Sequence, residues 1–215
     1  MKAINLGGVG GCCVTHAIQN TIADQPRYPY DWLLSNQSFV IRTFMNNGCF
    51  FDWDDASQLV GKEFRVNERD GLSVHDVSPD YRYEEQKSGI KYKYTRRFER
   101  LNVALFSDEP ILFVRVSNHT PNCKEWEDRF LSVPDDFKEW QRFIRYVNDH
   151  FKKPIYFLYF TENHDDYEKA SHANAEGSNI WVRWINKESE VSADHQIEYE
   201  FRDIYHSLIS RRTAT

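Results

Sequence analysis

The sequence has few of the residues that mark several classes of protein. Its 215 residues include 4 cysteines and 2 methionines, and no run approaches the roughly 18 apolar residues that span a bilayer. The cysteines, at positions 12, 13, 49 and 123, form neither a C-x-x-C pair nor a dense disulfide framework, and free thiols fit a reducing compartment. The N-terminus is polar and glycine-rich by residue 7. We therefore expect a cytoplasmic protein with no signal peptide, no membrane partner and no cofactor.

Positively charged residues are fewer than negatively charged ones. Lys and Arg number 27 against 33 Asp and Glu, and the formal charge of -6 argues against nucleic acid as a partner. Hydrophobic residues make up 40% of the chain and aromatic residues 15%, enough for an aromatic-rich core. The length suits one well-buried domain over residues 1–215.

Strand and helix patterns alternate through the second half of the chain. Near-continuous apolar runs, typical of strands buried on both faces, alternate with segments of helical periodicity. This order predicts an α/β domain with a largely parallel central sheet flanked by helices. Residues 46–71 read as loop, and residues 72–77 alternate as a strand. The predicted strands are 110–116, 154–160 and 180–185, and the predicted helices are 38–45, 90–105, 137–151 and 201–209.

A glycine-rich turn near the N-terminus carries two thiols into a predicted helix. The segment 3–6 can form a strand, Gly7, Gly8, Gly10 and Gly11 follow, and helical spacing begins at Val14. Unpaired N–H groups and the helix dipole stabilise a thiolate at such a position. Helical phasing turns Cys12 away from the inward stripe and places Cys13 on its flank, so Cys12 is the expected exposed thiol.

Other interpretations of this turn compete with a reactive thiol. A glycine-rich turn can hold phosphates, but the segment lacks G-x-x-x-x-G-K-[ST] and the third glycine of a dinucleotide fingerprint. A buried, inert cysteine is a stronger competitor. A metal site using Cys12 and His16, which share a helical face, lacks a matching second pair of ligands.

Three further groups are candidates for a site. Asp31 either orients a histidine or arginine or caps a helix beginning near Trp32. His75 ends a predicted strand, where a histidine is usually structural or solvated. The third group either binds an anionic ligand or forms a solvated ion-pair face with a neighbouring glutamate, and it comprises Arg96, Arg97 and Arg100.

Together, five segments resemble the DUF1796 family of papain-like cysteine peptidases, over roughly residues 3–160. The resemblance implies a cysteine nucleophile at Cys12, a histidine base at His75, and a proline-aromatic segment with Asp31 and Trp32 that shapes the site. Arg97 and Arg115 would support substrate binding. The segments are Leu6–Gly7 with Cys12–Val14, Tyr28–Trp32, His75–Asp76, Tyr94–Arg100 and Ile111–Arg115.

The chain departs from the family pattern in its longer glycine turn and its doubled cysteine, which leaves the choice between Cys12 and Cys13 open. The resemblance also implies an alternative fold, a papain-like α+β arrangement in which the cysteine helix packs on an antiparallel sheet. No glutamine precedes the cysteine as an oxyanion donor.

We therefore expect a cysteine peptidase or related thiol hydrolase or acyl transferase that acts on a peptide or acyl small molecule. His75 would hold Cys12 as thiolate, and Asp31 would orient the imidazole. The alternative is a non-catalytic domain that binds an anionic sugar or phosphate-containing ligand through its glycine turn and arginines. The substrate and the oligomeric state do not follow from the sequence.

Overall fold

A four-stranded, all-parallel sheet forms the centre of the structure. The computed structural model describes residues 1–8, 11–45, 57–60, 63–66, 71–73, 83–117, 136–171 and 179–213. The strand order is β1-β6-β7-β8, and every neighbouring pair is parallel. This confirms the predicted α/β class with a parallel sheet. The strands are β1 (Lys2–Asn5), β6 (Ile111–Val116), β7 (Ile155–Thr161) and β8 (Ile180–Trp184).

The central strands are buried on both faces, which explains their uninterrupted apolar runs. Along β6, Ile111 and Phe113 pack into one hydrophobic cluster, whereas Leu112 and Val114 pack into a second cluster on the opposite face. Successive side chains of a strand point to opposite faces, so each cluster receives every second residue.

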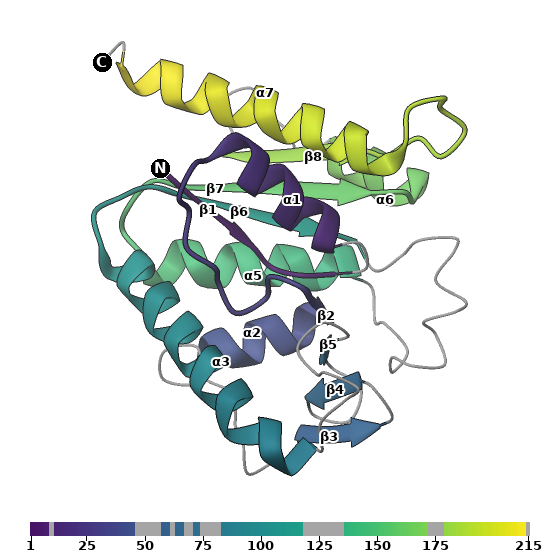
Figure 1. The fold of residues 1–215 in the computed structure, drawn as a ribbon. Helices are drawn as coiled ribbons and strands as arrows, with labels where there is room; N and C mark the ends of the chain where they lie inside the picture. Colours follow the sequence, from purple (N-terminus) through teal and green to yellow (C-terminus); the bar gives the residue numbers. More distant parts are fainter. Residues whose placement is uncertain are drawn as a thin grey trace.

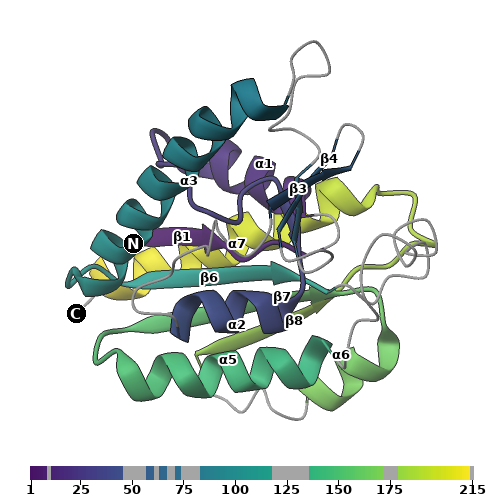
Figure 2. The same cartoon turned by 90° about the horizontal axis from the view of Figure 1, so that it is seen from below.

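Helices cover both faces of the sheet, as Figures 1 and 2 show. Helices α1 and α7 pack together over one face, and their apolar residues share a cluster. Helices α2, α3 and α5 lie on the other face, together with the shorter α6 beside β7 and β8. The helices are α1 (Gly11–Thr21), α2 (Gln37–Met45), α3 (Tyr83–Phe106), α5 (Asp136–His150), α6 (His164–Ser171) and α7 (Ala193–Thr213).

A small antiparallel sheet lies apart from the central one and has the order β2-β5-β4-β3. The prediction of loop over residues 46–71 was therefore wrong for β3 and β4. Each of these strands has four residues, too few for a reliable periodic signal. The strands are β2 (Leu33–Ser35), β3 (Ser57–Val60), β4 (Glu63–Val66) and β5 (Gly71–Ser73).

Three helices differ from the sequence prediction: α3, α6, and α7, which begins at Ala193 and not at residue 201. Helix α3 begins at Tyr83, ahead of the periodic apolar residues that start at Ile90. Helix α6 was not predicted because its eight residues, HDDYEKAS, offer little apolar periodicity. Its N-terminus is fixed locally, since Asn163 Oδ1 accepts hydrogen bonds from the N–H groups of Asp165 and Asp166.

The chain changes sides of the sheet between its first two neighbouring strands. After β1 it enters α1 on the face shared with α7, whereas the next helix that the structure describes after β6 is α5, on the opposite face. Ligand sites in open α/β sheets lie beyond the carboxyl ends of the strands. The start of α1 lies at the carboxyl edge of the sheet (Figure 1).

Candidate functional site

The turn between β1 and α1 brings both thiols to the carboxyl edge of the sheet. Gly7 and Gly8 have φ angles of +77° and +99°, which glycine adopts without strain. Asn5, the last residue of β1, accepts a hydrogen bond from Gly7 N at 2.9 Å and donates to Gly11 O at 2.7 Å. It also donates to Thr15 Oγ1 at 2.9 Å. One buried amide therefore fixes the turn to the start of α1.

Strand β2 packs directly against this turn. Ser35 Oγ donates to Leu6 O at 3.0 Å. A Cβ on Gly7 would lie 2.6 Å from Leu33 O and closer still to Ser35 Oγ. Both the close approach of β2 and the left-handed φ angle require a glycine at position 7. No bound phosphate is needed to explain this glycine.

The two thiols and a carboxylate from the far end of the chain form one cluster. Cys12 and Cys13 are both half-buried, and their sulfur atoms lie 3.9 Å apart. Cys13 Sγ donates to Asp194 Oδ1 at 2.8 Å, and Asp194 belongs to the first turn of α7. Cys13 also packs against the hydrophobic cluster under α1 and α7. The structure therefore brings a carboxylate from α7 against the second thiol.

The pKa values of the two thiols move in opposite directions. The pKa of Cys12 is lowered to about 6, first by a hydrogen bond from the Cys13 thiol and also by backbone N–H groups at the start of α1, whereas burial and Asp194 oppose the shift. The pKa of Cys13 is raised, because its thiol donates toward Cys12, is desolvated and faces the Asp194 carboxylate. Of the pair, Cys12 is the thiol that ionises first.

Asp31 is buried, and it stabilises a turn rather than a helix. Its Oδ2 accepts a hydrogen bond from Tyr28 N at 2.8 Å. The expected helix near Trp32 is absent, since a turn here leads into β2. Burial raises the pKa of Asp31 to about 6, against hydrogen bonds from Tyr28 N and Thr15 and the charges of Arg97 and Arg27.

Trp32 lies against α1, one helical turn beyond Cys12. Its φ of +66° is in the left-handed region. The ring meets His16 edge-on with centroids 4.9 Å apart, and the guanidinium of Arg27 lies 5.6 Å from the Trp32 centroid. Trp32 is half-buried, so part of its surface is accessible beside α1. The Pro29–Trp32 segment and the first two turns of α1 are therefore neighbours.

The arginines of α3 support that segment from the other side. Arg97 is buried and donates to Asp31 O at 3.4 Å. Arg100 Nε donates to Arg27 O at 2.9 Å. Arg96 is exposed, with its guanidinium 5.5 Å from the Tyr92 ring centroid. Two of the three arginines therefore hold backbone in place.

Arg115 lies beneath the candidate site with its side chain fully buried. It forms a two-point ion pair with Asp136, with Nε to Oδ2 at 3.1 Å and Nη2 to Oδ1 at 2.5 Å. It also donates to Leu6 O at 3.2 Å and to Ser35 O at 3.1 Å. Arg115 thus connects β6, the glycine turn, β2 and α5.

Tyr159 completes the same buried network. Its hydroxyl donates to Asp136 Oδ2 at 3.1 Å. Burial and the Asp136 charge raise the pKa of Tyr159 well above its ordinary value, so the phenol remains a donor. The charge of Arg115 is therefore compensated by a carboxylate that itself has several donors.

His75 and Asp76 lie outside the described residues, as do Gly10, Cys49 and Cys123. The structure therefore does not test whether His75 approaches Cys12.

Sequence reasoning missed three polar residues that build this region: Asn5, Asp136 and Asp194. Asn5 ends a strand and precedes glycines, a signal that could have been found. Asp136 directly precedes a predicted helix, where acids are common. Asp194 is 181 residues from Cys13 in sequence, and no local pattern connects the two.

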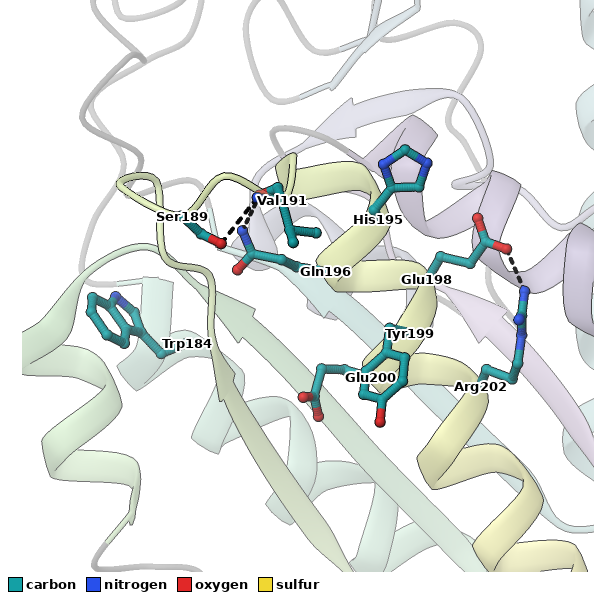
Figure 3. Close-up of a pocket in the computed structure, with 9 residues that line it drawn as sticks. All are labelled: Trp184, Ser189, Val191, His195, Gln196, Glu198, Tyr199, Glu200 and Arg202. Atoms are coloured by element: carbon teal, nitrogen blue, oxygen red, sulfur yellow. Dashed lines mark hydrogen bonds and ion pairs between the residues drawn. The ribbon is translucent and has the colours of Figure 1, made fainter.

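A separate surface pocket lies beside α7, with a volume of about 600 Å³ (Figure 3). Trp184 and Tyr199 lie at different sides of it, and Glu198 pairs with Arg202 at 2.5 Å. Cys12 and Cys13 do not line it. The lining residues are Trp184, Ser189, Val191, His195, Gln196, Glu198, Tyr199, Glu200 and Arg202.

Within the described ranges, no three or more His, Cys, Asp or Glu residues are grouped to hold a metal ion. None of the helices that the structure describes combines the length and apolarity needed to cross a membrane. No protein-family model, curated protein or solved structure matches the chain.

Proposed function

We propose that this protein is a cysteine hydrolase or acyl transferase with Cys12 as the nucleophile. The supporting observation is the position and environment of this thiol: it lies in the first turn of α1, is half-buried, and has a pKa lowered to about 6. At neutral pH such a thiol is largely thiolate, the form that attacks carbonyl carbon.

The chemistry would proceed in two steps. The Cys12 thiolate forms a bond to the acyl carbon of the substrate, and backbone N–H groups at the start of α1 stabilise the oxyanion. The leaving group departs with the proton that His75 has taken from Cys12, and the DUF1796 resemblance suggests His75 for this role. Water or another acceptor, deprotonated by His75, then attacks the acyl-enzyme and releases Cys12.

The other candidate residues have supporting roles in this proposal. Trp32 offers a partly accessible aromatic surface beside α1, suited to an apolar part of the substrate. Asp31, Arg97 and Arg115 are buried, and their contacts suit positioning of the glycine turn and the Pro29–Trp32 segment. Peptidase activity itself depends on the family resemblance, whereas thiol chemistry has support from the geometry.

The contacts of the arginines favour this proposal over a non-catalytic domain for an anionic ligand. Arg97, Arg100 and Arg115 all donate to oxygens of the protein. Arg96 is the exposed member of the set. An anion site would need several of these guanidinium groups to face a ligand.

Acylation of the protein by p-nitrophenyl acetate tests the proposal. The expected result is a burst of nitrophenol and an acetyl group on the peptide that contains Cys12, both lost in Cys12→Ser and retained in Cys13→Ser. Nitrophenol release at the same rate in Cys12→Ser, or an acetyl group elsewhere, would contradict it.

A further inference from the structure

We propose that Asp194 is a positioning residue that holds Cys13 as a hydrogen-bond donor and leaves Cys12 as the reactive thiol. This inference rests on the proposed thiol chemistry. Both cysteines lie in the first turn of α1, and Asp194 of α7 is in contact with one of the two.

The geometry shows why the contact is selective. Cys13 Sγ lies 2.8 Å from Asp194 Oδ1, whereas the sulfur atoms of Cys12 and Cys13 are 3.9 Å apart. Cys13 has a single S–H proton, and its sulfur lies nearer to Asp194 Oδ1 than to the Cys12 sulfur. Removing that proton would place a thiolate against a carboxylate, so Cys13 remains a thiol.

Asp194 and the start of α1 affect the pKa values of the two thiols unequally. Asp194, from α7, is the carboxylate that faces both thiols. On α1 itself, backbone N–H groups stabilise negative charge on Cys12, and His16 follows one turn later on an exposed position. Negative charge in the pair is therefore best placed on Cys12, farther from the carboxylate contact.

Helix α7 also supplies a matched control. One turn after Asp194, Glu198 Oε2 accepts a hydrogen bond from Asn20 Nδ2 of α1 at 3.3 Å. This is a second polar contact between the same two helices, but it does not involve a thiol. Glu198→Gln therefore reports the effect of weakening an α1–α7 contact, together with the Glu198–Arg202 ion pair, without changing a contact to a thiol.

The experiment measures iodoacetamide alkylation of each cysteine against pH by mass spectrometry, in the wild type, Asp194→Asn and Glu198→Gln. The expected wild-type result at pH 7 is alkylation of Cys12 at least tenfold faster than that of Cys13. Asp194→Asn should lower the pH midpoint of Cys13 alkylation by about one unit or more. The ratio of the Cys12 rate to the Cys13 rate should then fall about tenfold, because each pH unit is a tenfold change in the thiolate fraction of Cys13. Glu198→Gln should leave the ratio within about twofold.

A second comparison keeps the inference testable if Asp194→Asn does not fold. In Cys12→Ser, the remaining Cys13 should titrate above the free value of about 8.5, because Asp194 is still present. An ordinary midpoint for Cys13 in Cys12→Ser, or an unchanged rate ratio in folded Asp194→Asn, overturns the inference.

The two proposals fail in different ways. If Cys12 has an ordinary midpoint in the wild type, the thiol-hydrolase proposal fails, whatever Asp194 does to Cys13. If Cys12 is activated but the Asp194→Asn ratio equals that of the wild type, only the role of Asp194 fails.

Discussion

Replacement of Arg115 by methionine should destabilise the protein strongly, because it leaves the Asp136 carboxylate charged and buried. In the native structure neither side chain is exposed, and Arg115 supplies both hydrogen bonds of the ion pair. The substitution also removes the donors to Leu6 O and Ser35 O. The Tyr159 hydroxyl would remain as a donor to Asp136, but it carries no charge.

The magnitude follows from the cost of an unpaired buried charge. Breaking a buried ion pair by removing one partner costs about 3–5 kcal/mol. A neutral amide left in the same place costs about 1–3 kcal/mol. Adding Asp136→Asn to Arg115→Met should therefore recover about 2 kcal/mol, so the double variant is more stable than the single one.

Urea unfolding followed by circular dichroism gives the free energy of unfolding of the wild type, Arg115→Met and the double variant. A loss below about 1 kcal/mol in Arg115→Met would refute the reasoning. A double variant less stable than Arg115→Met would do so as well. If Arg115 were instead a substrate ligand, its replacement would raise KM and leave stability nearly unchanged.

Two further substitutions test the turn and the carboxylate beside α1. Gly7→Ala should destabilise by at least about 1–2 kcal/mol, because its φ of +77° is strained for alanine and the new Cβ would meet Leu33 O. Gly89 lies within α3, and a Cβ added there would have nothing within 4 Å, so Gly89→Ala should stabilise the protein by about 0.5–1 kcal/mol. Urea unfolding in which both variants are stabilised, or both are destabilised, would contradict this. The pKa of Asp31 is raised to about 6 in the folded state, above its unfolded value of about 3.9. The stability that its protonated form contributes is therefore complete below about pH 4 and is lost as pH rises through about 6, a loss of about 3 kcal/mol for a shift of about two units. Asp31→Asn should lack this loss, and parallel pH profiles of unfolding free energy in the wild type and Asp31→Asn would count against the buried, desolvated carboxylate.

The central sheet could be predicted because its strands are apolar enough to stand out. The runs that became β6 and β7 are buried on both faces, so their signal does not depend on alternation, whereas β8 is an edge strand whose run is only partly buried. The small sheet gave a weaker signal: alternation over residues 72–77 indicated a strand that overlaps β5, whereas β2, with three residues, was not predicted. Pairing of such short strands depends on contacts between segments far apart in sequence.

The site was predictable where its determinants are local. Glycines before a helix identified the position of Cys12, and the segment with Asp31 and Trp32 does lie against the same helix. The burial of Arg115 was not predictable, because its partners come from the turn, β2 and α5. Asp194 reaches Cys13 only through the packing of α7 on α1.

The most direct test of the central claim is the pH dependence of Cys12 alkylation, measured by mass spectrometry in the wild type and in His75→Ala. The account predicts a midpoint near 6 for Cys12 in the wild type, well below the free value of about 8.5. If His75 pairs with the thiolate, His75→Ala should raise that midpoint. A wild-type midpoint near 8.5 would contradict the account, because Cys12 would then be a packing residue.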